Sequence, residues 1–447
     1  MDKYNFQFNW LDIPGKKRLM SEALQFQFSQ TEKFSPNQIS QLQFANLQML
    51  VQHCTENVPY YKQRSYSKIK TWSDWHQLPL LGREDLQQHE ESLHADIDMS
   101  SREGKTYIKR SSGSTGRPVK VLTNDRAQLL WQAATLRDHL WHKRDFSQKL
   151  AVIKYIDDNK SEPPGKVSRY WGPSSALLFS TGPAVTISSS TDISKQYEWL
   201  REQKPGYLLT YPSILNALSE RNLRADNAIA LLGITTIGEN ISPETRHMAE
   251  RSFGGRVCDI YSCQEIGYIA LQCPQHNHYH LQAETCFVEV LDDNNQVCRP
   301  GEMGRVVVTH LHNYSMPLVR YEIGDYAIAG GSCDCGINLP VVERIIGRTR
   351  NLVSYPNGKR NWPSYNPMKL MELLPNVQFQ LIQKSLDTLL LRIGTNKPID
   401  DEVFLQVKTI INEAMGYPFN IQLEQLQIIP RSKSGKYEEF LSEVDNV

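Results

Sequence analysis

Residues 207–213, Tyr-Leu-Leu-Thr-Tyr-Pro-Ser, place a short apolar run directly before a proline. The run predicts a strand, and the proline is well suited to the first position of a following helix. Further apolar runs, at residues 150–156, 184–188, 234–238 and 256–260, alternate with helical stretches in the same way. Strands that alternate with helices form largely parallel sheets with helices on both faces. We therefore predict an α/β fold.

Two helices are predicted on the N-terminal side of this region. Ser35-Pro36 has the pattern of an N-cap followed by proline at the first helical position, and the helical spacing of apolar residues continues until Pro59. Residues 125–142 carry apolar side chains on one helical side and predict a second helix.

More strands are predicted on the C-terminal side. Residues 287–291 and 305–309 are apolar and border turn signals, so a β-rich subdomain is expected at about residues 270–345. After Arg350, the sequence predicts a compact region of strands and one helix. We therefore expect a large N-terminal domain at residues 1–347 and a small mobile α+β C-terminal domain at residues 348–447.

The composition is that of a globular protein without a strongly charged partner. The 49 Lys and Arg residues balance 49 Asp and Glu residues. Zero net charge argues against nucleic acid or an anionic membrane as the main partner, because both favour a basic surface. Residues 1–20 are polar, and no stretch approaches the ~18 consecutive apolar residues of a membrane span. We expect a cytoplasmic protein whose eight cysteines are free thiols or metal ligands.

Residues 110–118, Arg-Ser-Ser-Gly-Ser-Thr-Gly-Arg-Pro, form a loop whose composition suits anion binding. Gly113 and Gly116 allow a turn in which backbone N–H groups converge, the hydroxyl side chains add donors, and Arg117 adds charge. The spacing is not that of a Walker A loop. Taken alone, such a run of Ser, Gly and Thr is more often a solvent-exposed surface loop than an anion-binding loop.

The loop gains meaning from the segments that follow it. Each has an ordinary explanation when taken alone, such as a turn or a helix N-terminus. The segments are Gly238-Glu239, Tyr261-Ser262-Cys263-Gln264-Glu265, residues 320–325 ending in Asp325, residues 346–348 ending in Arg348, and Gly435-Lys436. In their order along the chain, the loop and these segments resemble the phenylacetate–CoA ligase family of adenylate-forming enzymes, over nearly the whole chain.

The resemblance implies a role for each segment. The loop holds the β- and γ-phosphates of ATP, Tyr261 stacks on adenine, and Asp325 binds the ribose hydroxyls. Glu265 binds Mg²⁺, and Lys436 reaches from the small domain to the substrate carboxylate and the α-phosphate. The implied catalytic residues are Lys436, Glu265 and Arg117, and the implied nucleotide-binding residues are Ser111, Ser112, Gly113, Ser114, Thr115, Gly116, Gly238, Glu239, Tyr261, Ser262, Asp325 and Arg348.

This chain departs from the family pattern at a few positions. Arg117 stands where the family usually has lysine, which keeps the charge. Cys263 and Gln264 replace the usual residues of their segment, and Arg350 stands where the family usually has an acidic hinge residue. These departures motivate one alternative, a non-catalytic nucleotide-binding homologue, although the retained Lys436 counts against it.

The resemblance also implies a reaction. A carboxylic acid and ATP give an acyl-adenylate and pyrophosphate, and the thiol of CoA then displaces AMP. The substrate class implied is an aryl or arylacetic acid, and the candidate pocket residues Tyr211, Pro212 and Ile237 are mostly apolar, which suits such a group. No nucleic acid or membrane partner is expected.

A second enzyme alternative keeps only the adenylation. The acyl group then passes to a carrier protein, an amine or a saccharide, because some relatives are associated with capsular polysaccharide pathways. Relatives are often dimers, so a homodimer is also expected.

A cysteine–histidine pattern predicts a structural zinc site. Cys273 lies seven positions before His280, and Cys333-Asp334-Cys335-Gly336 follows further along the chain. Three thiolates and one imidazole supply the four ligands of a closed tetrahedral site. Some phenylacetate–CoA ligase relatives share this spacing. His276 is the alternative fourth ligand, and ordinary buried thiols beside a surface histidine cluster are the alternative to a metal site.

Overall fold

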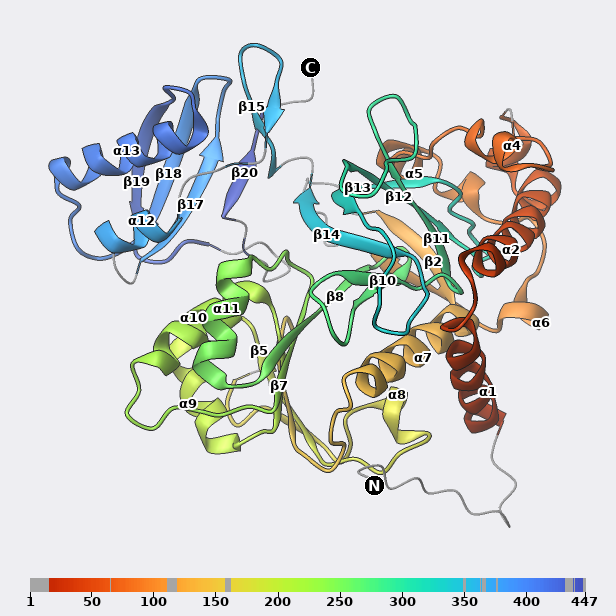
Figure 1. Cartoon of the computed structure of the whole chain (residues 1–447), viewed down its shortest axis with the longest axis horizontal. Helices are drawn as coiled ribbons and strands as arrows, with labels where there is room; N and C mark the ends of the chain where they lie inside the picture. Colours follow the sequence, from red (N-terminus) through yellow and green to blue (C-terminus); the bar gives the residue numbers. More distant parts are fainter. Residues whose placement is uncertain are drawn as a thin grey trace. The chain divides into compact units, whose positions relative to one another are not determined.

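The computed structural model describes residues 16–64, 66–110, 119–156, 162–348, 351–361, 363, 367–374, 377–430, 437 and 439–444 (Figure 1). The chain divides into two compact units, Met1–Ile346 and Gly347–Val447. None of the described helices is long and apolar enough to cross a membrane.

A large mixed sheet forms the centre of the N-terminal unit. Its strand order is β11-β12-β13-β14-β10-β9-β8-β7-β6-β3-β5-β4. The strands are β3 (Leu150–Lys154), β4 (Lys166–Ser168), β5 (Ala184–Ser188), β6 (Tyr207–Thr210), β7 (Gly233–Ile237), β8 (Arg256–Cys263), β9 (Gly267–Gln272), β10 (Tyr279–Leu281), β11 (Cys286–Leu291), β12 (Met303–His310), β13 (Tyr321–Ala329) and β14 (Val341–Arg348).

The parallel part of this sheet confirms the predicted α/β fold. β5, β3, β6, β7 and β8 pair in parallel, in that order. The helices α9 (Ile193–Gln203), α10 (Pro212–Leu223) and α11 (Pro243–Phe253) lie on one side of these strands, while α7 (Asp125–Trp141) lies on the other (Figure 1). Each of α9, α10 and α11 buries apolar side chains in a shared core, because a helix in an α/β layer presents one apolar face to the sheet.

The β-rich region continues the same sheet. Antiparallel pairing joins β8 to β9, β9 to β10 and β10 to β14, so the strands of residues 279–348 extend the sheet instead of forming a separate one. A second core lies here and includes side chains of α2 (Pro36–Asn57). As predicted, Ser35 caps α2, accepting a hydrogen bond from the backbone N–H of Gln38, and the helix ends before Pro59.

The remaining elements of the N-terminal unit are short, apart from the first helix. A hairpin of two antiparallel strands stands apart from the large sheet. These elements are α1 (Lys16–Thr31), α3 (Pro59–Lys62), α4 (Trp72–His76), α5 (Arg83–Gln88), the 3-10 helix Glu91–Leu93, α6 (Ser100–Glu103), the hairpin strands β1 (Thr106–Arg110) and β2 (Lys120–Asn124), and α8 (Pro173–Ala176).

The C-terminal unit is a small α+β layer. Its sheet has the order β19-β18-β17-β20, and α13 (Asp401–Met415) buries Val407 and Ile411 in its core. Asp400 caps α13 at its start, and Gly416 ends it in the left-handed conformation. The other elements are β15 (Val353–Ser354), β16 (Arg360–Asn361), α12 (Pro367–Leu373), β17 (Gln378–Gln383), β18 (Thr388–Gly394), β19 (Asn420–Leu426) and β20 (Phe440–Ser442).

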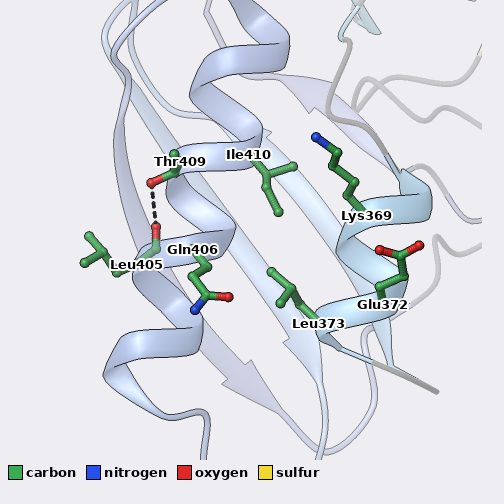
Figure 2. A pocket seen from close by; sticks show the side chains of 7 residues that line it. All are labelled: Lys369, Glu372, Leu373, Leu405, Gln406, Thr409 and Ile410. Carbon is green, nitrogen blue, oxygen red and sulfur yellow. Dashed lines mark hydrogen bonds between the residues drawn. The ribbon is translucent and has the colours of Figure 1, made fainter.

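An open groove of about 440 Å³ runs between α12 and α13 in this unit (Figure 2). Leu373 and Ile410 line it, and Leu405 at its edge is 64% exposed. None of its lining residues is among the candidate site residues of the sequence analysis.

Candidate functional site

The carboxyl ends of three neighbouring parallel strands carry the candidate pocket and nucleotide residues. Thr210 at the end of β6 pairs with Thr236, and Ile237 at the end of β7 pairs with Ile260 of β8. The residues that directly follow these pairs, Tyr211, Gly238 and Tyr261, therefore lie along one edge of the sheet. Ligands of α/β proteins bind at this edge.

Gly238 has a backbone requirement that explains its residue type. Its φ is +79°, in the left-handed region where a residue with a Cβ is strained. The chain bends there, directly after β7 ends at Ile237.

Glu239 links two predicted segments. Its Oε2 accepts a hydrogen bond of 2.9 Å from the backbone N–H of Ser213, in the first turn of α10. The first N–H groups of a helix lack partners within the helix, and a carboxylate there also interacts favourably with the helix dipole. Tyr211, the buried residue at the start of α10, has no capping side chain of its own, so Glu239 supplies the cap.

Asn240 is a site-edge residue that sequence reasoning missed. Its Nδ2 donates a hydrogen bond of 2.9 Å to the backbone carbonyl of Ile346, near the end of β14. The only available sequence signal was its position directly after Gly238-Glu239.

Tyr261 and Asp325 are in direct contact. The phenolic hydroxyl donates a hydrogen bond of 2.7 Å to Oδ2 of Asp325, and Tyr261 is 8% exposed. Tyr261 is on β8 and Asp325 on β13, and these strands are not neighbours in the sheet. The contact therefore depends on the way the sheet curves and not on strand pairing.

Two carboxylates lie near Cys263, the last residue of β8, two positions after Tyr261. Burial raises the pKa of the Cys263 thiol well above its usual value, and the charges of Glu265 and Asp325 raise it further. Burial likewise raises the pKa of Tyr321, and Glu265 adds to that effect. Glu265 and Asp325 therefore both lie within electrostatic reach of one thiol, and two nearby carboxylates are a suitable environment for a magnesium ion.

The other described candidates lie at element ends. Pro212 is buried at the first position of α10, and Ile237 ends β7. Ser262 is half-buried on β8, and Gln264 is exposed in the turn after it. Arg348 is the last residue of β14 and belongs to the second unit.

Several candidates lie outside the described residues. They are the loop residues Ser111, Ser112, Gly113, Ser114, Thr115, Gly116, Arg117 and Pro118, together with Arg350 and Lys436. The structure does describe the strands on either side of residues 111–118, which are β1 and β2. Arg110 pairs with Lys120 in the β1–β2 hairpin, so the loop begins and ends between adjacent strands.

The predicted zinc ligands come together. Sγ or Nε2 atoms of Cys273, His280, Cys333 and Cys335 lie within 4.8 Å of one another. The Sγ atoms of Cys273 and Cys333 are 3.8 Å apart, and Sγ of Cys335 is 3.3 Å from Nε2 of His280. β9 and β10 position the first two ligands, and the turn between β13 and β14 positions the others.

The surroundings of the cluster fit a metal ion. Nδ1 of His280 lies 3.1 Å from the carbonyl oxygen of Leu339, and a carbonyl oxygen only accepts, so Nδ1 carries the proton. The Nε2 lone pair then faces the thiols, which is the orientation that ligand histidines adopt. His276, the alternative ligand, instead places Nε2 2.6 Å from Oδ1 of Asp334. The geometry favours His280.

Comparisons with known proteins agree with this architecture. Residues 367–443 match the family described as CapK C-terminal domain. The chain is 22% identical over 428 residues to the phenylacetate–coenzyme A ligase of Escherichia coli K12, covering 90% of this chain and 94% of that ligase. It is 19% identical over 467 residues to protein CapK of Staphylococcus aureus, covering 96% and 95%.

Solved structures show the same fold over the whole chain. A 2-hydroxyisobutyryl-CoA ligase in the postadenylation state, in complex with R3-HIB-AMP, has a TM-score of 0.71 at 18% identity, covering 99% of this chain and 97% of that chain. An open conformation of the same ligase with 2-HIB-AMP and CoA has a TM-score of 0.59. The sequence similarity and the fold agree: over most of its length the chain is similar to phenylacetate–coenzyme A ligases, and it has the fold of the solved 2-hydroxyisobutyryl-CoA ligase.

Proposed function

We propose that this protein activates a carboxylic acid with ATP as an acyl-adenylate and then transfers the acyl group to the thiol of CoA. The contact between Tyr261 and Asp325 carries the proposal. It brings the candidate adenine-stacking ring and the candidate ribose-binding carboxylate together at the strand ends where Gly238 also lies. The similarity to phenylacetate–CoA ligases supports the same conclusion.

The first step demands cations near the reacting atoms. A carboxylate oxygen of the acid attacks the α-phosphorus, the bond to the bridging oxygen of the β-phosphate breaks, and pyrophosphate leaves with the electron pair. Both reactants are anionic, so the developing charge has to be neutralised. We assign this to Lys436 and Arg117, and Glu265 is the residue to hold Mg²⁺, which neutralises phosphate charge when bound.

The second step replaces the nucleotide. The thiol sulfur of CoA, having lost its proton, attacks the acyl carbon, and the C–O bond to AMP breaks. In our proposal the small domain moves between the two steps, which is a common way of exposing one bound group to successive partners.

The acid in this proposal carries an aryl or arylacetic group. Tyr211 is buried at the strand ends, and Pro212 and Ile237 flank it with apolar surface. The backbone N–H of Tyr155 donates to the hydroxyl of Tyr211 at 3.2 Å, which fixes the ring. Apolar walls with one fixed polar group suit a ring-bearing acid. Relatives named phenylacetate–coenzyme A ligase support this substrate class.

We also propose zinc at Cys273, His280, Cys333 and Cys335. Three thiolates and one imidazole complete a tetrahedral shell without an open position, so the ion is structural and takes no part in the reaction. It joins the β9–β10 hairpin to the turn before β14, two segments about 60 residues apart in sequence.

A second candidate function has a specific observation in its favour. Residues 367–443 match a CapK C-terminal domain, and the similarity to protein CapK covers 96% of the chain. The acceptor in this alternative is a carrier protein, an amine or a saccharide in place of CoA.

Pyrophosphate release across a panel of carboxylic acids, with and without CoA, tests both functions. We expect release with aryl or arylacetic acids and formation of the corresponding thioester. Lys436→Ala should abolish thioester formation, while Lys433→Ala in the same segment should retain it. Adenylation that yields no thioester with CoA would favour the second candidate, and no release with any acid would refute both.

A further inference from the structure

Lys109 is a positively charged residue to which the proposed function gives no role. It lies on β1, two positions before the loop of residues 111–118. Its neighbours Ile108 and Arg110 are exposed, whereas Lys109 is half-buried. Alternating side chains on a strand point to opposite faces, so Lys109 is the residue that β1 directs inward immediately before the loop.

An aromatic wall holds the ammonium group. Nζ of Lys109 lies 4.1 Å from the ring centroid of Trp131 on α7. The rings of Trp131 and Tyr268 are 5.4 Å apart, and Tyr268 is on β9. The β8–β9 hairpin that carries Glu265 therefore borders the same space as Lys109. A cation over an indole face is held in position without being neutralised.

The described residues leave this charge without a counter-ion. No ion pair of Lys109 with a carboxylate is found among them. Burial lowers the pKa of Lys109, and among the described residues the Cys263 thiol is the neighbour that opposes this. Residues 111–118 contain no Asp or Glu, so the adjoining loop cannot supply the missing carboxylate.

A neighbouring histidine adds no second positive charge that would repel an anion. Burial, the charge of His312 and then that of Lys109 lower the pKa of His310 to about 3, so His310 is neutral near pH 7. A half-buried ammonium beside neutral groups has lost part of its hydration without gaining a counter-ion among the described residues. An anion that binds there recovers that lost interaction.

We infer that Lys109 binds an oxyanion of the substrates, and this inference rests on the proposed function. The chemistry that fits is a phosphate oxygen of the nucleotide or pyrophosphate, or a carboxylate oxygen of the acid. Both are close by in the proposed site, since Tyr268, whose ring packs against Trp131, lies on the β8–β9 hairpin that carries Glu265, the candidate magnesium ligand.

Calorimetric titration with two probes separates these sources. The probes are magnesium pyrophosphate and phenylacetate. Lys109→Met keeps the apolar stem, and Lys109→Arg keeps the charge over Trp131. Lys105→Met, at an exposed position directly before β1, is the control. Lys109→Met should weaken one probe at least tenfold, Lys109→Arg less than threefold, and Lys105→Met not at all. Weaker pyrophosphate binding identifies the phosphate source, and weaker phenylacetate binding identifies the carboxylate source.

Binding of both probes at wild-type strength by Lys109→Met would overturn the inference, as would a wild-type protein that binds neither. The titrations need no turnover, so they separate failure of this inference from failure of the proposed reaction, which pyrophosphate release reports. If Lys109→Met does not fold, acetylation of the wild-type protein by acetic anhydride, mapped by peptide mass spectrometry, replaces it. Protection of Lys109 by either probe supports the inference, and the absence of protection by both overturns it.

Discussion

The hydroxyl of Tyr261 donates a hydrogen bond of 2.7 Å to Oδ2 of Asp325, across 64 positions of sequence. The bond fixes the tyrosine ring and orients the carboxylate of Asp325. In the proposed adenosine site, the tyrosine ring stacks on the base and the carboxylate accepts from ribose hydroxyls.

Asp325→Ala is expected to weaken ATP binding at least tenfold, because the carboxylate is the proposed acceptor for the ribose hydroxyls. Tyr261→Phe removes only the phenolic hydroxyl and keeps the stacking ring, so its effect should be smaller, about threefold. Calorimetric titration with ATP measures both. Asp293→Ala, in the exposed turn after β11, is the matched control. Equal ATP affinity in Asp325→Ala and the control would contradict the nucleotide site.

Glu239→Ala should destabilise the protein and also impair the reaction. It removes the acceptor for the Ser213 N–H at the start of α10, and loss of a helix cap costs about 1 kcal/mol in the free energy of unfolding. Asp192→Ala is the matched control, because Asp192 caps α9 through the N–H groups of Ser194 and Lys195. Urea unfolding should show similar losses for both variants. Pyrophosphate release should fall in Glu239→Ala only, and an equal fall in both would reduce Glu239 to a purely structural residue.

Cys335→Ser should release zinc and destabilise the region around it. The three remaining ligands cannot complete a tetrahedral shell. The variant should therefore bind only a small fraction of the near-stoichiometric zinc expected in the wild-type protein. Cys298→Ser, another buried cysteine that is not part of the cluster, should keep its zinc. Metal analysis by mass spectrometry makes the comparison. Wild-type protein without bound zinc would refute the metal site.

Stability should fall as the pH drops from about 6.5 towards 4. Burial first, then nearby positive charge, lowers the pKa of His310 to about 3, whereas an unfolded histidine titrates near pH 6.5. Between these values the unfolded chain binds a proton that the folded chain does not, so each fall in pH favours unfolding. The contribution of one such histidine is about 1 kcal/mol per pH unit in this window.

His310→Gln tests this origin. Its free energy of unfolding in urea, measured from pH 7 to 4, should fall less steeply than that of the wild-type protein. The exposed His247 on α11 provides the control, and His247→Gln should keep the wild-type slope. Identical slopes in all three proteins would show that His310 does not set the acid sensitivity.

Much of the fold was predictable because it rests on local patterns. The run at Tyr207–Thr210 predicted β6, and the proline after it marked the start of α10. Pro36 marked the start of α2 in the same way. The sequence did not indicate that the β-rich strands extend the parallel sheet, because strand neighbours are chosen by packing between distant segments and not by periodicity.

The amino-acid sequence by itself determined the alternation of strands and helices, the glycine turn at Gly238, and the spacing of the cysteines and His280. These are properties of short segments, set by side-chain pattern and backbone freedom. Only the tertiary structure decided that Tyr261 meets Asp325 and that Lys109 is half-buried against Trp131. Contacts between residues far apart in sequence depend on strand order and sheet curvature, and no local pattern encodes those.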